Sequence, residues 1–321
     1  MTVDYSIDQI RSEIHSAIRR YDADIGQFIR KTPVLKLSGA SLGVACAEIW
    51  LKLEHLQVGG SFKARGAYNR LTATPPPAAG VTIASGGNAG IATAAAAQYL
   101  GVPCEVFLPE VSTQAKRARL LALGATVHVV GAAYAQALQA CVAHQKTSGA
   151  LMSHAYDQLE IVAGAGTVAF EIEAQDGLPD TCLVSVGGGG LIAGIAAQWA
   201  GRVQVLALEP QLAPTLHAAR AAGQPVDVAV SGIAADSLGA KRIGDIAWGV
   251  AQTAISTSLL LPDAAIRAAQ LTLWHELKLA VEPAAALGLA ALQTGVYLPS
   301  SGEKVCLVLC GANIDPASLN G

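Results

Sequence analysis

The stretch CLVSVGGGGLIAG, residues 182–194, decides how the rest of the chain is read. An apolar run is followed by four glycines and then by apolar residues with helical spacing. We interpret it as a buried strand, a tight turn and a helix, the unit from which parallel α/β sheets are built. A purely structural turn rarely needs four glycines, because each one weakens the folded state entropically. Their backbone N–H groups can instead surround an anion at the start of the helix.

The same alternation extends along the chain in both directions. Apolar runs that end in turn residues predict buried strands at 49–54, 81–85, 104–109, 126–130, 182–187, 203–209 and 304–311. Segments rich in Ala and Leu predict helices at 88–100, 113–123, 133–148, 159–175, 191–200, 262–278 and 283–294. This pattern predicts an α/β protein with parallel-strand-rich sheets flanked by helices.

The length and one Pro-rich break predict two domains. A chain of 321 residues fits about two domains of ordinary size. The break ATPPPAAG, residues 73–80, is the candidate crossing between them. We predict a small domain at 73–155 and a large domain that combines 1–72 with 156–321.

Composition excludes several classes of function. The net charge of −3, with no basic run, argues against a nucleic-acid partner. The longest uncharged stretches, 86–104 and 183–201, contain internal glycines and predict strand-turn-helix units, not membrane spans. Six cysteines occur without a CxxC pair or a Cys/His cluster, which favours reduced thiols in a cytoplasmic protein.

Two further strand ends carry unusual residues. In open parallel sheets the ligand lies beyond the carboxyl ends of the strands. SGGNAG, residues 85–90, follows one predicted strand, and its small residues expose backbone amides where the next helix starts. Its plain alternative is an ordinary turn with Asn88 as helix cap. CGAN, residues 310–313, ends the last strand, and its plain alternative is a buried cysteine that packs as a small hydrophobe.

Lys63 distinguishes two cofactor hypotheses. Residues 188–193 also fit the G-x-G-x-x-A pattern of a dinucleotide site, with Glu209 at the spacing of a ribose-binding acid, so an NAD-binding dehydrogenase is an alternative. Such an enzyme needs no isolated lysine, whereas VGGSFKARGAYNR, residues 58–70, sets Lys63 among small residues. Pyridoxal phosphate (PLP) needs a lysine for covalent attachment, an anion cradle and a group that faces the pyridine nitrogen. The plain alternative for Lys63 is a solvated surface lysine.

Five motifs in order resemble the serine/threonine dehydratases, which are PLP enzymes of fold type II (tryptophan synthase β-like). They are GSFKARGA, SGGNAG, GGGGLIAG, EPAAA and CGAN, and the similarity runs from about Thr32 to Asn313. The resemblance implies a PLP-dependent ammonia-lyase that converts L-threonine, L-serine or a related 3-hydroxy amino acid to the 2-oxo acid and ammonia. It also implies a homodimer. A serine or amino-acid racemase on the same scaffold is the alternative.

The resemblance also implies a role for each matching residue. Lys63 binds the cofactor covalently and later acts as base, and Phe62 lies near the ring face. Cys310 faces the pyridine nitrogen, Gly232 lines the cofactor pocket, and Glu282 lies behind the ring. The phosphate is held by Gly187, Gly188, Gly189, Gly190 and Leu191. The substrate carboxylate is held by Ser85, Gly86, Asn88 and Ala89, and Asn88 also hydrogen-bonds the ring hydroxyl.

The chain departs from the family pattern at two places. Relatives that bind a divalent cation use a glutamate, a carbonyl and an aspartate; Glu209 and Ala213 match, but Thr215 replaces the aspartate. We therefore assign no metal, and a divalent ion, a monovalent ion or none stays open. The racemases of the family carry a serine immediately after the position of Ser85, where this chain has Gly86. Gly86 offers no second acid/base group, which favours elimination over racemisation.

Overall fold

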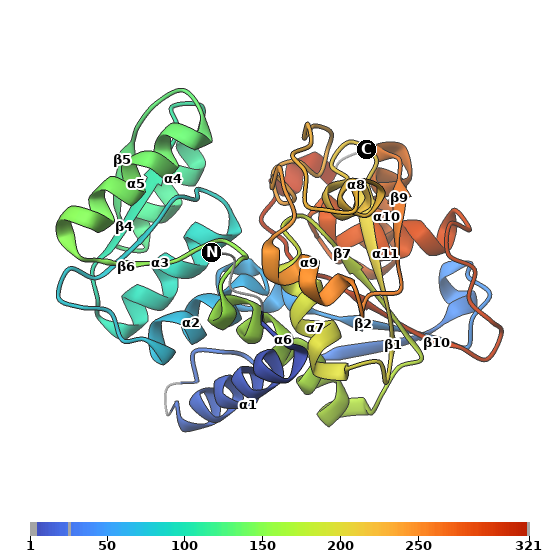
Figure 1. Ribbon diagram of the computed structural model, residues 1–321. Helices are drawn as coiled ribbons and strands as arrows, with labels where there is room; N and C mark the ends of the chain where they lie inside the picture. The colour runs from blue at the N-terminus through green and yellow to red at the C-terminus, as the bar shows by residue number, and fades with distance from the viewer. Residues whose placement is uncertain (1–4, 25–26, 320–321) are drawn as a thin grey trace.

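Ten strands form two sheets in the residues that the computed structural model describes, 5–24 and 27–319 (Figure 1). The six-stranded sheet has the order β1-β2-β10-β7-β8-β9, and the four-stranded sheet has the order β5-β4-β3-β6. The strands are β1 (Val34–Ser38), β2 (Glu48–Lys52), β3 (Val81–Ile83), β4 (Cys104–Leu108), β5 (Thr126–Val129), β6 (Leu151–Met152), β7 (Thr181–Ser185), β8 (Gln204–Pro210), β9 (Thr257–Leu261) and β10 (Lys304–Val308).

Helices flank both sheets, as the sequence pattern predicts. They are α1 (Ile7–Ala23), α2 (Lys63–Ala73), α3 (Asn88–Leu100), α4 (Gln114–Ala122), α5 (Tyr134–Ser148), α6 (Leu159–Asp176), α7 (Gly190–Trp199), α8 (Thr215–Ala222), α9 (Asp245–Ala251), α10 (Asp263–Leu277) and α11 (Pro283–Gln293). Among the described residues, no helix is both long and apolar enough to cross a membrane.

Nearly all strand pairs are parallel, and the exception lies at one edge. β10 pairs in parallel with β2 and β7, and every pair of the four-stranded sheet is parallel. β1, which the pattern did not predict, runs antiparallel to β2. Only residues 39–47 connect these two strands. Such a connection suits an antiparallel pair, because a parallel pair needs a longer crossover.

Alanine and glycine allow close packing around the four-stranded sheet. In α3, the nine residues from Ala89 to Ala97 are all buried, and the helix ends at Gly101 in the left-handed conformation. Small side chains let this helix approach α2 and β4 closely. The four-stranded sheet falls within residues 73–155, and Figure 1 shows it in a lobe of its own. The exact domain boundaries stay a prediction.

Candidate active site

A pocket lies at the carboxyl ends of strands from both sheets. It receives residues that follow β7, β10, β3 and β6, the position expected of a ligand site in parallel sheets. Its lining residues are Phe62, Lys63, Asn88, Tyr156, Ser185, Gly187, Gly188, Gly189, Gly190, Leu191, Ser237, Leu238, Glu282, Ala284 and Cys310.

Four helices begin at this pocket, and two of them present open N-termini. α2 begins at Lys63, α3 at Asn88, α7 at Gly190 and α11 at Pro283. No side chain caps α3 or α7. Among the described residues, no amide at 187–192 or 86–89 donates a hydrogen bond. Free N–H groups and the positive end of each helix dipole make both termini suitable for anions.

Close packing explains why the turn before α7 is glycine. A Cβ on Gly188 would approach the ring of Tyr156 to 2.3 Å, and Gly189 has a φ of +85°. The Gly187 carbonyl accepts a hydrogen bond from the Thr215 hydroxyl, and the Gly188 carbonyl accepts one from the Gly244 amide. The carbonyls therefore have partners elsewhere, while the amides of the turn stay free for a ligand.

Lys63 lies at the first position of α2, half-buried inside the pocket. Its Nζ donates to the Ala155 carbonyl at 2.7 Å and lies 5.0 Å from the ring centroid of Phe62. Burial lowers the pKa of Lys63 to about 8, against the opposing effects of Cys310 and Glu282. About a tenth of the amine is thus unprotonated at pH 7, and this fraction grows as the pH approaches 8, which supplies the form that a nucleophile or base requires.

Cys310 is held next to Lys63 by the backbone. The Cys310 carbonyl accepts from the Phe62 amide at 3.1 Å, and the Gly60 carbonyl accepts from the Ala312 amide at 2.9 Å. Burial raises the pKa of the Cys310 thiol, and the nearby Glu282 carboxylate raises it further. Cys310 therefore presents a neutral thiol to the pocket at physiological pH.

Buried Glu282 is hydrogen-bonded to half-buried Asn88, and both residues line the pocket. Glu282 is 4% exposed, and its two oxygens accept from Asn88 Nδ2 at 2.9 and 3.0 Å. Oε1 also accepts from the Asn313 amide at 2.9 Å. Burial raises the pKa of Glu282, although these hydrogen bonds partly offset it. Glu282 thus acts on Asn88, with which it is in direct contact.

A buried ion cluster fixes the helix that carries Lys63. Arg65 donates to Glu54 at 2.7 and 2.8 Å and to Glu171 at 3.1 Å, and Lys52 donates to Glu171 at 2.6 Å. Two cations and two anions balance in a region where each side chain is at most 13% exposed. Removing one partner would leave a buried charge, so the cluster holds the first turn of α2 in place.

The structure brings most of the predicted site residues together, with one correction. Gly232 is exposed and does not line the pocket; a Cβ there would meet Asp263 at 2.6 Å. Ser237 and Leu238, later in the same segment, line the pocket instead. The segment predicted from the resemblance thus reaches the pocket at Ser237 and Leu238, and Gly232 lies outside its lining. Of the predicted carboxylate loop, Asn88 lines the pocket, and Ser85, Gly86 and Ala89 lie beside it.

Glu209 lies away from the pocket, beneath the glycine turn. It is fully buried and accepts from the amides of Leu216 and His217 at 2.7 and 2.8 Å, and from the Ser258 hydroxyl at 2.5 Å. Its carboxylate therefore caps α8 and is not directed to a ribose, as the NAD alternative would need. Ala213 is buried just before this helix.

Several pocket residues were not predicted from the sequence. Tyr156 follows the two-residue strand β6, which is too short to give a sequence signal. Ser185 ends β7, and its hydroxyl donates to the Ala284 carbonyl at 2.5 Å. The rule that ligands meet the carboxyl ends of strands would have found Ser185, since it precedes the glycines directly.

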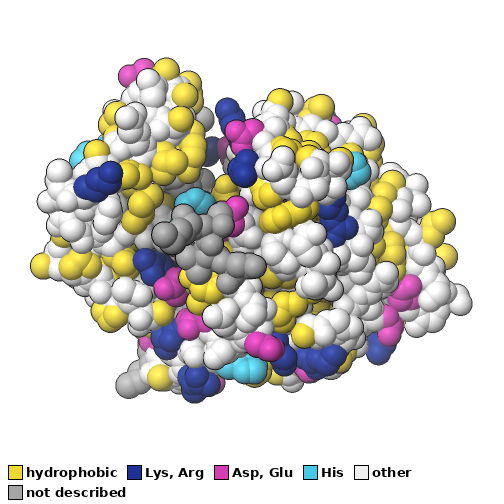
Figure 2. All heavy atoms as spheres, viewed as in Figure 1, with side chains coloured by type: hydrophobic (Ala, Val, Ile, Leu, Met, Phe, Trp, Pro, Cys, Tyr) yellow, Lys and Arg dark blue, Asp and Glu magenta, His cyan; other side chains and the backbone are white. Residues whose placement is uncertain are grey.

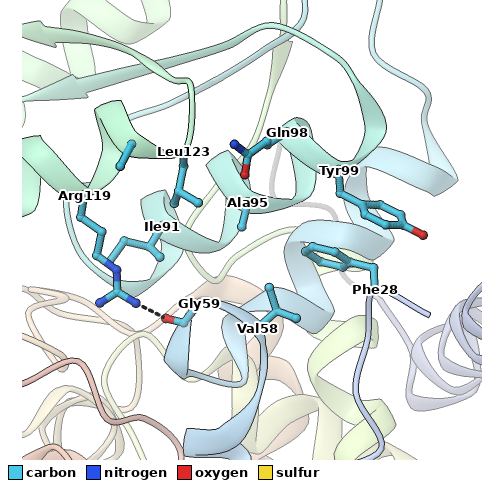
Figure 3. Close-up of a pocket in the computed structure, with 10 residues that line it drawn as sticks. Phe28, Val58, Gly59, Ile91, Ala95, Gln98, Tyr99, Arg119 and Leu123 are labelled. Carbon is cyan, nitrogen blue, oxygen red and sulfur yellow. Dashed lines mark hydrogen bonds between the residues drawn. The ribbon is translucent and has the colours of Figure 1, made fainter. Parts of the chain in front are cut away.

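A second, more open groove lies beside α3 and α4 (Figure 3). Phe28, Val58, Ile91 and Tyr99 give it a largely apolar lining. Arg119 points across one end and donates to the Gly59 carbonyl at 3.2 Å. This groove lacks a side chain with the properties of Lys63, so the chemistry belongs to the first pocket.

Comparisons with known proteins agree with this geometry. A family model described as "Pyridoxal-phosphate dependent enzyme" matches residues 25–311. An L-threonine ammonia-lyase of Geobacter sulfurreducens is 35% identical over 95% of this chain and 77% of its own length. A phenylserine dehydratase of Ralstonia pickettii is 33% identical over 94% of both chains. The solved structure of maize serine racemase is similar with a TM-score of 0.87 at 30% identity, covering 99% of this chain and 96% of that one.

Proposed function

The chain belongs to the family of pyridoxal-phosphate dependent enzymes, and from this premise we propose that it is a dehydratase of 3-hydroxy amino acids. The substrate would be L-threonine, L-serine or a related 3-hydroxy amino acid, and the products the 2-oxo acid and ammonia. The observation that carries the proposal is that, among the described residues that line the pocket, Lys63 is the one base that remains available. The other titratable side chains of its lining are each engaged or held neutral: Glu282 with Asn88, Tyr156 with the Arg242 carbonyl, and Cys310 as a thiol.

The residues present fit a phosphorylated pyridine ring. The glycine turn before α7 leaves no room for side chains and offers free amides for a phosphate. Phe62 and Lys63 enter the same pocket, as does the neutral thiol of Cys310. When bound, pyridoxal phosphate supplies an aldehyde that captures amines and a ring that accepts electrons from a bond broken at the α-carbon.

The chain's own groups account for the elimination. The open N-terminus of α3 would hold the substrate carboxylate, which places the α-carbon within reach of Lys63. In its amine form, Lys63 takes the α-proton, and its lowered pKa makes that form available. The β-hydroxyl would leave as water with a proton returned by the Lys63 ammonium, and hydrolysis of the dehydrated product releases the 2-oxo acid and ammonia. If the neutral thiol of Cys310 faces the ring nitrogen, that nitrogen would stay unprotonated and the ring would store less charge than with a carboxylate partner, which favours elimination over transamination.

Racemisation is the second candidate, because the maize relative in the comparison is a serine racemase of closely similar fold. It requires an acid/base group on the face opposite Lys63. Gly86 provides none at the position where the racemases of the family carry serine. We therefore assign elimination as the main reaction.

Product analysis on a substrate panel tests the proposal. Holoenzyme is incubated with L-serine, L-threonine, 3-phenylserine and 3-hydroxyaspartate, and the 2-oxo acid, ammonia and both enantiomers of the residual amino acid are measured. We expect equal amounts of 2-oxo acid and ammonia from at least one substrate, with negligible D-enantiomer. Rapid formation of the D-enantiomer without ammonia would contradict the assignment. Borohydride reduction should separately fix the cofactor to the peptide that contains Lys63.

A further inference from the structure

Asn313 has every hydrogen-bonding group of its side chain engaged. Its Nδ2 donates to the Gly59 carbonyl at 2.8 Å and to Asn88 Oδ1 at 2.6 Å, and its Oδ1 accepts from Arg119. Its backbone amide donates to Glu282. An asparagine amide offers two N–H donors and one acceptor oxygen with two lone pairs, so both donors and one acceptor position are used. The side chain is fixed in one orientation, because rotating its amide by half a turn would place Oδ1 against the Gly59 carbonyl oxygen and Asn88 Oδ1.

Through Asn313, the orientation of Asn88 is fixed as well. Asn88 Oδ1 faces a donor, Asn313 Nδ2, and Asn88 Nδ2 faces two acceptors, the oxygens of Glu282. Rotating the Asn88 amide by half a turn would put oxygen against the Glu282 carboxylate and nitrogen against nitrogen. Both contacts would be repulsive, because the first would bring two acceptors together and the second two donors. Asn88 therefore keeps its N–H groups directed to Glu282, and both residues line the pocket.

Asn313 also touches the segment that leads to Lys63. Gly60 has a φ of +77°, and a Cβ there would approach Asn313 Oδ1 to 2.6 Å. Gly59 and Gly60 lie only a few residues before Lys63. On its outer side, Asn313 is supported by Arg119 of α4, which also reaches the Gly59 carbonyl (Figure 3). Through its side chain Asn313 thus joins the Lys63 segment, α3 and α4, and through its backbone amide it reaches Glu282 at the N-terminus of α11.

We propose that Asn313 is a positioning residue of the active site that acts through Asn88. It keeps the N–H groups of Asn88 directed to Glu282 and so fixes how that side chain would meet the cofactor in the pocket. The expected effect of Asn313 on turnover rests on the proposed function. Its effect on cofactor binding depends on the family alone, so the two can be tested apart.

The substitution Asn313→Asp removes the two donor hydrogen bonds and adds a negative charge, whereas Asn313→Ala removes them without one. The aspartate preserves the shape of the side chain, the backbone amide to Glu282 and an acceptor for Arg119. The new carboxylate faces Asn88 Oδ1 and the Gly59 carbonyl, so both contacts become repulsive. We expect the dissociation constant of pyridoxal phosphate to rise about 10-fold and kcat/KM to fall about 10-fold. The pH at which the visible absorbance of the bound cofactor changes should also shift.

A double-variant cycle with Asn88→Ala identifies the route of the effect. If Asn313 acts through Asn88, Asn313→Asp should change cofactor binding less than about 2-fold once Asn88 is alanine. Equal losses in both backgrounds would overturn the proposal, as would unchanged cofactor binding and absorbance in Asn313→Asp.

Asp315→Asn, an exchange of the same two residue types two positions later, is the matched control and should behave as wild type. If the aspartate variant does not fold, Asn313→Ala completes the same cycle. Absent turnover in wild type would contradict the proposed function, yet the binding data would still decide the role of Asn313.

Discussion

At the scale of single residues, Lys63 shows how burial gives a common side chain a reactive form. A lysine on a surface helix keeps its proton well above pH 8, whereas Lys63 is withdrawn into the pocket, where its one hydrogen-bond partner among the described residues is a neutral carbonyl, Ala155 O, and its pKa is lowered to about 8. The sequence predicted a reactive lysine from its small neighbours and the family motif. Its pKa could not be predicted in this way, because burial depends on Ala155, which is 92 residues distant in the chain.

The lowered pKa of Lys63 predicts a pH-dependent stability difference in the apoprotein. At pH 7 the folded protein buries a protonated amine, so Lys63→Met should raise the free energy of unfolding by about 2 kcal/mol. Between pH 8 and 10.5 the folded wild type has released this proton and the unfolded chain has not, so wild type gains stability as the pH rises. The advantage of the variant should therefore shrink over this range. Urea unfolding at pH 7 to 10.5 measures it, and a constant difference would contradict the lowered pKa. Lys241→Met, at an exposed lysine, is the control.

Gly86 predicts how the reaction can be redirected. Gly86→Ser should introduce measurable D-serine formation from L-serine, with some loss of elimination, because it adds an acid/base group. A Cβ at Gly86 would approach Leu108 Cδ2 to 2.8 Å, and Leu108 is fully buried. The end of this side chain must move, at a cost of about 1–3 kcal/mol. Chiral chromatography after partial turnover gives the result.

Two variants separate the hydroxyl at position 86 from the crowding that accompanies it. Gly86→Ala crowds Leu108 equally but adds no acid/base group, so it should form no D-serine. Gly86→Ser combined with Leu108→Val relieves the crowding and should recover stability. D-serine from the alanine variant, or from wild type, would mean that another residue serves the opposite face.

At the scale of elements, the pocket is built from strand ends and helix starts that the sequence largely predicts. All seven predicted strands and all seven predicted helices are present, and α3 has the predicted bounds, 88–100. Three strands were not predicted: β6 has only two residues, and β1 and β9 lie at the two edges of the six-stranded sheet. α2 was not predicted as a helix, since its buried Arg65 and Asn69 disturb the apolar periodicity. Those two residues find partners only in distant segments, which a local pattern does not reveal.

The turn before α7 predicts a specific loss of cofactor binding. Gly188→Ala should weaken pyridoxal phosphate binding at least 100-fold, because its Cβ would lie 2.3 Å from the ring of Tyr156. Either the ring or the turn must move, and the free amides would then no longer converge on one anion. Fluorescence titration of the apoprotein with the cofactor measures the loss. Gly302→Ala, where a Cβ would meet nothing within 4 Å, is the matched control. Normal affinity in Gly188→Ala would show that the phosphate lies elsewhere.

At the scale of the whole molecule, the site depends on contacts between segments that are far apart in the chain. Parallel sheets require crossovers, so neighbouring strands such as β2 and β10 come from opposite ends of the sequence. The family resemblance predicted that five motifs share one site. It did not predict the contacts that join them, such as Asn88 with Asn313, 225 residues apart. Those depend on the packing of complete sheets and helices.

The two lobes also meet across the mouth of the site. Figure 2 shows a hollow between them, with basic and acidic side chains close together at its edge. Lys116 of α4 forms an ion pair with Asp236, which directly precedes the pocket residue Ser237. The two side chains are 31% and 66% exposed, so the pair contributes little to global stability. It can still bias the lobes toward a closed arrangement, in which water is excluded from the substrate.

Removing this ion pair should weaken substrate binding at low ionic strength but not at high ionic strength. We expect Lys116→Ala to raise KM about 3-fold at low ionic strength with little change in melting temperature, since the pair acts between lobes and not within a core. The difference should disappear toward 1 M salt, where the screening length is about 3 Å. The exchange Lys116→Asp with Asp236→Lys restores opposite charges and should recover most of the affinity, whereas either reversal alone should be worse than alanine. KM measured across a salt series for these variants decides the question.

Arg117→Ala on the same helix is the matched control, because Arg117 donates to the Glu110 carbonyl within its own lobe. A KM effect that persists at high salt, or that the charge exchange does not reverse, would mean that Lys116 acts on the site through something other than its charge.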